Sequence, residues 1–441
     1  MVSEWPWIPA FDSAEDIEED LIPEGWQVKQ IEDLYHQLPI GKRFDKKSAS
    51  SSGTVPVIDQ SANGVIGWHD ESPGIMASQE SPVVTFANHT CEMRLMRRPF
   101  SVIQNVFPLV GKEGVCDTRF LYYGTKGRVH LEEYKGHYPD FRRKWILVPP
   151  LPEQRAIAHI LGTLDDKIEL NRRMNRTLEA IAQAIFKSWF LAAGKPIPDE
   201  FADRAARRAQ LAHGESPLPE NIRRLFPDEF QDSELGLIPK GWKVGTVADL
   251  GNIVCGKTPP TSEPANYGNE IPFITIPDMR DKAFVTTTAR YLSPTGAATQ
   301  PKKLLPPLSV CVSCIATPGL VALTSQPSHT NQQINSIICR DDISPYWCYS
   351  KLVNMKNEII TGGAGGSATL NLNKGQFSSL KLVLPDKHVI VAFHAKTRSL
   401  FRSILVNIRQ IDCLREIRDT LLPNLISGHI LLGTKLEGDV Q

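Results

Sequence analysis

A repeat that joins two distant parts of this 441-residue chain limits what it can fold into. Residues 21–28 (LIPEGWQV) return as residues 237–244 (LIPKGWKV), and IEDL at residues 31–34 returns in the same register as VADL at residues 247–250. The copies are 216 residues apart (237 minus 21), whereas solenoid repeats are typically about 20–50 residues long. The repeat therefore indicates two large, related halves.

The similarity fades inside each half and returns near its end. LVPP at residues 147–150 corresponds to LVLP at residues 382–385, and a stretch with helical periodicity follows each of them. These two stretches align without gaps, which places Asn171, Leu178, Ile181 and Ile185 opposite Asn407, Leu414, Ile417 and Leu421. Each half thus has a fixed opening, a variable body and a fixed helix.

Both fixed helices carry apolar residues at seven-residue intervals, which is typical of coiled coils. Pro152 and Glu153 favour a first helical turn, Gly194 and Pro196 predict the end of helix one, and Pro423 is expected to end or kink helix two. The predicted seam positions are Ile157, Leu164, Asn171, Leu178 and Ile185 in helix one and Phe393, Leu400, Asn407, Leu414 and Leu421 in helix two. Ile160, Met174 and Ile181 are expected to complete the first stripe, and Ile404, Ile411 and Ile417 to widen the second.

The simplest partner for each apolar stripe is the other one. Over about 34 residues such a helix spans on the order of 50 Å. A buried asparagine fixes the register of a coiled coil at some cost in stability, so Asn171 and Asn407 are candidates to pair across the seam. The alternative is that each helix packs only on its own body; the shared heptad pattern favours a coiled coil.

Short β-type runs broken by Gly, Pro, Asn and Ser fill both bodies, among them residues 55–58, 83–86, 273–276, 308–312 and 334–338. A helix is expected around residues 345–360, so each body is predicted to be α+β. The predicted organisation is an acidic N-terminal tail at residues 1–20, a first body at 21–150, helix one at 151–193, a linker at 194–235 with a short basic helix around 201–211, a second body at 236–385, and helix two with a C-terminal tail at 386–441.

Composition is that of a globular protein with no overall charge bias. The chain has 49 basic and 49 acidic residues, which excludes a uniformly basic coat but leaves DNA binding through local patches open. No run approaches the roughly 18 apolar residues of a membrane helix. The acidic N-terminus does not resemble a signal peptide. The eight cysteines do not form a small disulfide scaffold, and we expect a cytoplasmic location.

Three patterns resemble catalytic or metal sites. Residues 251–258 fit the phosphate-loop pattern GxxxxGK[ST], which needs a helix after the loop, but two prolines follow Thr258 and discourage one. Pro139-Asp140 with residues 165–167 (DDK) resembles a nuclease signature, yet its second part lies within the heptad pattern, where solvated charges are expected. Cys311 and Cys314, with Cys339 and Cys348, have zinc-like spacing within a β-type run that favours buried thiols. We therefore predict no catalytic residue and no metal site.

Basic and amide side chains in both bodies are candidates for DNA contact. Arg and Lys bind phosphates or guanine, and Asn and Gln can read adenine. The first-body candidates are Lys42, Arg43, Lys46, Lys47, Arg94, Arg97, Arg98, Lys126, Arg128, Arg142 and Arg143, with Tyr122, Tyr123, Lys135, Tyr138 and Lys144 nearby. The second-body candidates are Lys257, Arg280, Lys302, Lys303, Asn331, Gln332 and Lys374, with Gln333 adjacent.

The chain resembles the specificity subunit of type I restriction–modification systems over nearly its whole length. The resemblance lies in the twin openings, residues 147–190 (beginning LVPPLPEQR), residues 226–242 (FPDEFQDSELGLIPKGW), GKTPPT at 256–261, residues 55–67 (VPVIDQSANGVIG) and residues 271–279 (IPFITIPDM). The second half departs from it, with LPDKH at residues 384–388 in place of PPLPEQR.

The resemblance implies an α+β fold with two diverged target-recognition domains, joined and spaced by two long helices that form an intramolecular antiparallel coiled coil with pseudo-two-fold symmetry. Each domain would read half of a split site in double-stranded DNA. The fixed regions would recruit two methyltransferase subunits and, through the complex, motor/nuclease subunits. The chain would hold no cofactor, because S-adenosylmethionine, ATP and magnesium would belong to those partners. Two other functions remain open from the residues: a phosphate-loop nucleotide-binding protein and a coiled-coil scaffold without a DNA role.

Overall fold

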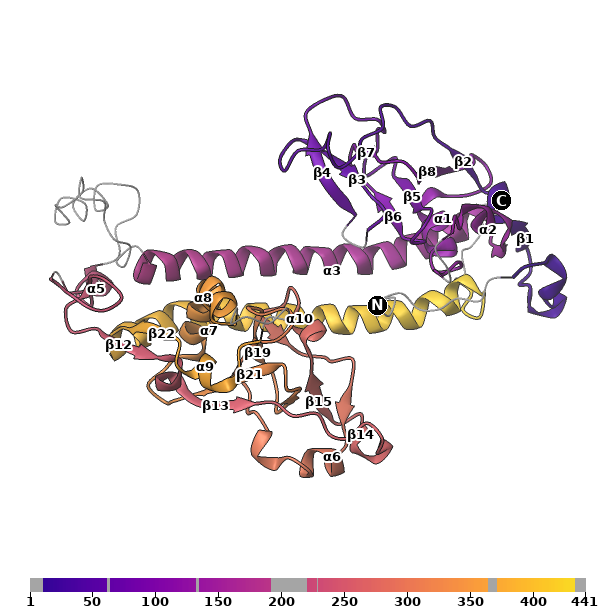
Figure 1. Cartoon of the computed structure of the whole chain (residues 1–441). Helices are drawn as coiled ribbons and strands as arrows, with labels where there is room; N and C mark the ends of the chain where they lie inside the picture. The colour runs from indigo at the N-terminus through magenta and orange to yellow at the C-terminus, as the bar shows by residue number, and fades with distance from the viewer. Residues whose placement is uncertain are drawn as a thin grey trace, which may run out of the picture. The chain divides into compact units, whose positions relative to one another are not determined.

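The computed structural model describes residues 11–61, 64–131, 135–191, 220–227, 229–363 and 371–432. The backbone forms two compact units, residues 1–169 with 413–441 and residues 170–412, so each contains one body and a segment of both long helices. Figure 1 shows the two bodies and the helices α3 (Leu151–Phe186) and α10 (Lys387–Ile426). The predicted basic helix at residues 201–211 lies outside the described residues.

In unit 1 an antiparallel strand pair closes the base of the body. Strand β1 (Gln27–Gln30) pairs with β9 (Trp145–Val148), placing Gln27 opposite Val148. Between them lie a four-stranded sheet of order β2-β8-β5-β6 and a three-stranded sheet of order β4-β3-β7. The other elements are β2 (Tyr35–Gln37), β3 (Val55–Ile58), β4 (Val65–His69), β5 (Val83–Ala87), β6 (Met93–Met96), β7 (Ser101–Val102), β8 (Val106–Gly111), α1 (Thr118–Thr125), α2 (Tyr138–Arg143) and the 3-10 turns η1 (Ala14–Asp16), η2 (Glu19–Leu21) and η3 (Ile31–Asp33).

In unit 2 the same arrangement recurs. Strand β12 (Lys243–Thr246) pairs antiparallel with β22 (Lys381–Leu384) and encloses sheets of order β13-β21-β18-β19-β16 and β14-β17-β15-β20. The strands are β10 (Phe230–Gln231), β11 (Ile238–Pro239), β13 (Gly251–Cys255), β14 (Tyr267–Gly268), β15 (Ile271–Ile274), β16 (Phe284–Val285), β17 (Tyr291–Leu292), β18 (Val310–Ser313), β19 (Val321–Thr324), β20 (His329–Thr330) and β21 (Ile334–Cys339). The helical elements are α5 (Glu220–Arg223), α6 (Pro294–Ala298), α7 (Pro345–Asn354), α8 (Lys356–Gly362), α9 (Lys374–Ser378) and the turns η6 (Val247–Leu250), η7 (Pro264–Asn266), η8 (Ile276–Met279) and η9 (Pro301–Lys303).

The two bodies share one topology although their sequences have diverged. The order β2-β8-β5-β6 in the first body matches β13-β21-β18-β19 in the second. Strand β3 pairs antiparallel with β4 and parallel with β7, just as β15 pairs antiparallel with β17 and parallel with β20. The predicted α+β class and pseudo-two-fold repeat are confirmed, and the expected helix near residues 345–360 is present as α7 and α8.

The repeated opening forms the same turn in both halves. The amide of Trp26 donates to the carbonyl of Pro23 and that of Trp242 to Pro239, both at 3.0 Å. The third residue of each turn is a glycine with positive φ, +80° at Gly25 and +85° at Gly241, as a type II turn requires. Both tryptophan side chains are buried, which explains why the GW pair is kept in the repeat.

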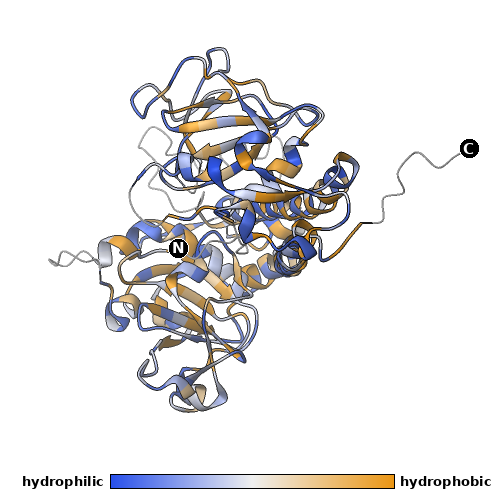
Figure 2. Cartoon of the chain, turned by 90° about the vertical axis from the view of Figure 1, so that its right-hand side faces the viewer, coloured by the Kyte–Doolittle hydropathy of each residue, from blue (hydrophilic) through white to orange (hydrophobic). Residues whose placement is uncertain are grey.

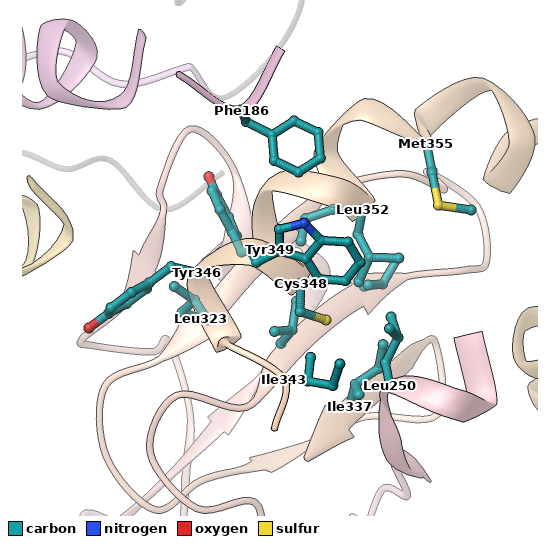
Figure 3. Close-up of a cluster of buried hydrophobic side chains, with 14 of the residues drawn as sticks. Phe186, Leu250, Leu323, Ile337, Ile343, Tyr346, Cys348, Tyr349, Leu352 and Met355 are labelled. Atoms are coloured by element: carbon teal, nitrogen blue, oxygen red, sulfur yellow. The ribbon is translucent and has the colours of Figure 1, made fainter. Parts of the chain in front are cut away.

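Each body builds its own hydrophobic core, and Figure 2 shows apolar residues concentrated on the strands of both bodies. In unit 2, Cys348 and Leu352 of α7 lie over Leu323 and Ile337 of the sheet, and Phe186 of α3 adds its ring to the same cluster (Figure 3). Burial of such side chains is the main favourable term in folding. The long helix is therefore part of the core of unit 2.

Helices α3 and α10 run antiparallel within each unit. In unit 2, Asn171 bonds Gln410, Asn175 bonds Asn407, and the ring of Phe186 packs on that of Phe393. Residues further along α3 contact residues earlier in α10, so the two helices run in opposite directions. In unit 1, Asp165 is paired with Arg418. The predicted intramolecular antiparallel coiled coil is confirmed.

Several details of the predicted seam are wrong. Asn171 and Asn407 do not bond each other; each donates to a different amide of the facing helix, at 2.8 and 2.9 Å. Met174, Ile181 and Ile417 are exposed. On α3 the second buried series is instead Leu161, Ile168 and Ala182. Each of these residues follows a predicted seam residue by four positions, whereas the prediction placed the second series three positions after the seam residues.

The ends of the helices agree with the sequence prediction except that Pro423 does not end the second one. Helix α3 begins with Leu151 and Pro152 in its first turn, as predicted, and continues into a π-helical turn at Lys187–Leu191. Helix α10 does not end at Pro423 but runs on to Ile426. Burial of Leu422, Leu425 and Ile426 in the core of unit 1 supports this last turn despite the missing amide hydrogen.

Candidate nucleic-acid interface

A cationic loop links β2 to β3 in the first body. Its residues Lys42, Arg43, Lys46 and Lys47 are all exposed. The loop is held by Asp45, whose Oδ1 accepts from the amide and hydroxyl of Ser48 at 2.8 and 2.7 Å, and these bonds lower the pKa of the Asp45 carboxyl. Within the described residues no ion pair involves Arg43, Lys46 or Lys47. These three cations remain available to a ligand.

An aromatic residue extends this surface. The guanidinium of Arg98 lies 5.4 Å from the centroid of the Trp68 ring, and Trp68 joins the loop through backbone hydrogen bonds with Ser50. Lys42 is paired with Glu71 at 2.5 Å. We call Lys42, Arg43, Lys46, Lys47 and Arg98 the first cationic surface. Such a combination of exposed cations and a half-buried aromatic ring suits a phosphate backbone.

Other first-body candidates have structural partners. Arg94 donates to the carbonyls of Asp59 and Ser61, and Arg97 is paired with Asp166 of α3. The side chain of Arg128 is 6% exposed and donates to the carbonyl of Gly124; its burial lowers its pKa to about 9. We therefore leave Arg128 out of any surface. Tyr122 and Tyr123 are also buried, in α1, where Lys126 bonds the hydroxyl of Tyr122 at 2.8 Å.

The basic residues around α2 face carboxylates of their own unit. Both Nε and Nη2 of Arg142 contact Glu32 Oε2, at 2.9 and 2.6 Å, and Arg143 contacts Asp140 at 3.1 Å. Lys144 is paired with Asp12, and Lys135 lies 3.9 Å from Asp140. Tyr138 bonds the hydroxyl of Tyr35. This group fastens α2 to the opening segment.

The phosphate-loop pattern in the second body does not form a phosphate loop. Residues 251–255 are strand β13, and the amides of Gly256 and Lys257 donate to the carbonyls of Ile334 and Thr330 at 3.1 and 3.0 Å. The hydroxyl of Thr258 donates to Gln332 Oε1 at 2.6 Å. A phosphate loop needs free amides at the start of a helix, and both amides here are occupied. The structure contradicts the nucleotide-binding alternative at this segment.

The remaining second-body candidates are spread over loops, the turn η9 and the start of helix α9. Lys257, Arg280, Lys302, Gln332 and Lys374 are exposed, and Lys303 is half-buried. Asn331 is 8% exposed, and its amide group is bonded to Gln333. Lys257 and Gln332 lie in neighbouring loops, because Thr258 bonds Gln332. The structure thus brings Lys257 close to the turn that contains Asn331 and Gln332.

The cysteines with zinc-like spacing lie in the β-sheet. Cys311 is buried in β18, where its sulfur accepts from the Ser336 hydroxyl at 3.4 Å, and burial raises its pKa to about 12. Burial likewise raises the pKa of Cys314 to about 11. Within the residues that the model describes, no group of three or more His, Cys, Asp or Glu side chains could hold a metal ion.

The carboxylates of the nuclease-like pattern belong to the helix pair. Asp165 accepts from Arg418 at 2.8 Å and from the Tyr123 hydroxyl at 2.9 Å. Its side chain is 24% exposed and that of Arg418 is 10% exposed. The expectation of solvated charges is therefore wrong for Asp165, which forms a largely buried ion pair, and right for the more exposed Asp166.

The long helices carry exposed apolar residues at equivalent positions. Leu170 and Ile181 of α3 are each 44% exposed, and their counterparts Val406 and Ile417 of α10 are 62% and 42% exposed. Residues eleven apart lie on nearly the same helix face. Met174, also exposed, lies between Leu170 and Ile181. We call these five residues the helix stripes. No helix in the described part of the chain is both long and apolar enough to cross a membrane.

Comparison with known proteins is consistent with this architecture. A family model described as the type I restriction modification DNA specificity domain matches residues 23–180 and 239–393. The chain is 41% identical over 313 residues to the type I restriction enzyme HindI specificity subunit of Haemophilus influenzae, covering 64% of this chain and 68% of that one. It is 24% identical over 350 residues to the MjaIX specificity subunit of Methanocaldococcus jannaschii, covering 76% and 74%.

A solved structure shares the fold. The type I restriction–modification S subunit from M. genitalium superposes with a TM-score of 0.57 at 15% identity, covering 91% of this chain and 96% of the other. The family model matches both halves, from the repeated opening through the body into the helix. The chain therefore belongs to the type I restriction modification DNA specificity family.

Proposed function

We propose that this chain is the sequence-specific DNA-binding subunit of a type I restriction–modification complex. Each body reads one half of a bipartite site in double-stranded DNA, and α3 with α10 sets the gap between the halves. The observation that carries the proposal is the pair of bodies with one shared topology and different exposed side chains. A shared scaffold with different surfaces suits two different half-sites.

The helix stripes support docking of two copies of one partner. Leu170 and Ile181 recur as Val406 and Ile417 at equivalent places, and a repeated apolar face favours a repeated partner. In the proposed complex these partners are methyltransferase subunits, and motor/nuclease subunits join through the complex. The chain itself is non-catalytic. In this proposal S-adenosylmethionine, ATP and magnesium are bound by the partner subunits.

Genome-wide sequencing of methylated adenines tests the proposed function. Deleting the gene in its host is expected to remove methylation from one split motif, and a plasmid copy should restore it. Deletion of a methyltransferase partner gene gives the positive control, because it should remove the same motif. An unchanged methylome in the strain without this chain would refute the proposal.

The first cationic surface is expected to supply phosphate contacts. Replacing Arg43, Lys46 and Lys47 together by alanine should weaken binding to specific and unrelated DNA alike. The slope of log affinity against log salt should fall by about 2 to 3, since each phosphate contact contributes roughly 0.9. Fluorescence anisotropy of the methyltransferase complex at several salt concentrations measures this slope. Arg143→Ala, an exposed arginine paired with Asp140, is the control; an unchanged slope in the triple variant contradicts the assignment.

The helix stripes give a prediction about assembly. Leu170→Glu with Ile181→Glu places two charges on the exposed face of α3 and should reduce co-purification of the methyltransferase subunit at least several-fold. Ala180→Glu is the matched control, because it adds a charge to an exposed position about 100° round the helix from Ile181. Size-exclusion chromatography with light scattering measures the stoichiometry. Full assembly of the double variant would show that the partner docks elsewhere.

A further inference from the structure

The two bodies present a glutamine at the same point of their shared topology. In the first body, β7 pairs parallel with β3 and leads through residues 103–105 into β8. In the second, β20 pairs parallel with β15 and leads through residues 331–333 into β21. The middle residue of each three-residue turn is Gln104 or Gln332, and both side chains are exposed.

A segment with at least one exposed lysine or arginine borders each turn in the same way. The amide of Phe44 in the cationic loop donates to the carbonyl of Val102 at 3.4 Å, and the amide of Lys257 donates to the carbonyl of Thr330 at 3.0 Å. Val102 and Thr330 are the equivalent residues that immediately precede the two turns. Each turn therefore adjoins a segment with basic side chains, several in the first body and Lys257 in the second, that can hold a phosphate backbone.

The turn in the second body is held rigidly. Asn331 Nδ2 donates to Gln333 Oε1 at 3.0 Å, and the amide of Gln333 donates to Asn331 Oδ1 at 3.1 Å. The Thr258 hydroxyl donates to Gln332 Oε1 at 2.6 Å, which fixes the orientation of that side-chain amide. Within the described residues, no hydrogen bond engages the NH₂ group of Gln332. The group is oriented and free to donate.

The turn in the first body has its own support. Asn105 has a φ of +65°, its carbonyl accepts from the Asn88 amide at 2.9 Å, and its side chain lies 3.2 Å from His89 Nε2. The amide of Ile103 donates to the carbonyl of Ile58 at 3.0 Å. Both residues that flank Gln104 are thus anchored while its own side chain faces solvent.

We propose that Gln104 and Gln332 each read an adenine in the half-site bound by their own body, through the major-groove edge of the base. Glutamine donates to adenine N7 and accepts from its N6 amino group, which makes it one of the two side chains suited to this base. In both bodies the glutamine is the middle residue of an anchored turn that adjoins at least one exposed cation. This inference rests on the proposed function and names the residues that carry part of the sequence choice.

Single substitutions in the second body test the inference. Gln332→Ala in the methyltransferase complex should lower the preference for A·T at one position of one half-site by about 5- to 150-fold, the range for loss of one bidentate base contact. The other half-site should keep its sequence. Selection of bound fragments from a randomised DNA library measures both halves at once. Asn252→Ala, which removes an exposed amide on β13, is the matched control; Gln104→Ala should relax the opposite half.

Gln332→Glu separates base reading from a structural role. Its carboxylate can still accept the Thr258 hydroxyl, but it cannot donate to adenine N7 and instead suits the amino group of cytosine. The preferred base should therefore shift from adenine toward cytosine at that one position. A wild-type complex that selects no motif defeats the proposed function itself. A wild-type complex that selects a motif which Gln332→Ala, Gln332→Glu and Gln104→Ala all leave unchanged overturns this inference alone.

Discussion

Removing one heptad from each long helix is expected to abolish methylation of the original split site while leaving both half-sequences recognisable. The matched segments are residues 171–177 of α3 and 404–410 of α10, which face each other through Asn171 with Gln410 and Asn175 with Asn407. Their joint removal deletes both polar pairs whole and preserves the antiparallel register on either side. Each helix loses about 10 Å, at 1.5 Å per residue.

That change is large on the scale of DNA. A shift of about 10 Å corresponds to roughly three base pairs at 3.4 Å each, so the two bodies should no longer match the original gap. Adenine-methylation sequencing of a strain carrying the variant, with thermal denaturation to verify folding, measures the outcome. Arg409→Ala, an exposed change inside the deleted segment, is the control. Methylation of the same site at the same spacing would show that the helices do not set the gap.

Arg418→Met is expected to destabilise unit 1 by about 3 kcal/mol, because breaking one side of a buried ion pair leaves the other charge unpaired. Asp165 would lose the partner that donates to it at 2.8 Å and would keep the hydrogen bond from the Tyr123 hydroxyl. Urea unfolding followed by tryptophan fluorescence measures the free energy. The double variant Arg418→Met with Asp165→Leu should recover much of the loss, since it removes both charges of the more buried pair and leaves only Asp419, whose side chain is 35% exposed, without its arginine.

An exposed ion pair supplies the contrast. Arg142 and Glu32 have side chains that are 50% and 34% exposed, so Arg142→Met should cost no more than about 1 kcal/mol. Equal stability of Arg418→Met and the wild-type chain would mean that the Asp165 pair contributes nothing to unit 1. A loss in Arg142→Met as large as that in Arg418→Met would remove burial as the explanation.

The repeat and the heptads predict the architecture because they are local patterns with fixed periods. Pro152 and the seven-residue series correctly locate helix α3. The same series does not decide which flanking position completes the seam, and the prediction that Met174 lies in the interior is wrong because this residue is exposed. That choice depends on packing between helices, where Ala182 is fully buried.

The candidate interface was harder to predict, because charge in a sequence does not reveal its partner. Arg142 and Arg43 are both exposed in the first body, but only Arg142 faces a carboxylate 110 positions away in the chain. The sequence predicts that Arg128 is a surface cation, but in the structure it is buried. No pattern in the sequence singles out Gln104. Its place becomes visible only when strands β7 and β20 are found to be equivalent.

The strand pairs at the base of the bodies have a consequence for how such proteins change. β1 with β9 and β12 with β22 close their bodies in the same register, so Gln27 opposite Val148 corresponds to Lys243 opposite Leu384. In both halves the chain leaves the strand pair at the end of its first strand, forms the body, and returns at the start of its second strand. Each body is thus bounded by the same two fixed points. In the proposed function, replacing the segment between them is expected to change the DNA target while the fixed flanks stay the same.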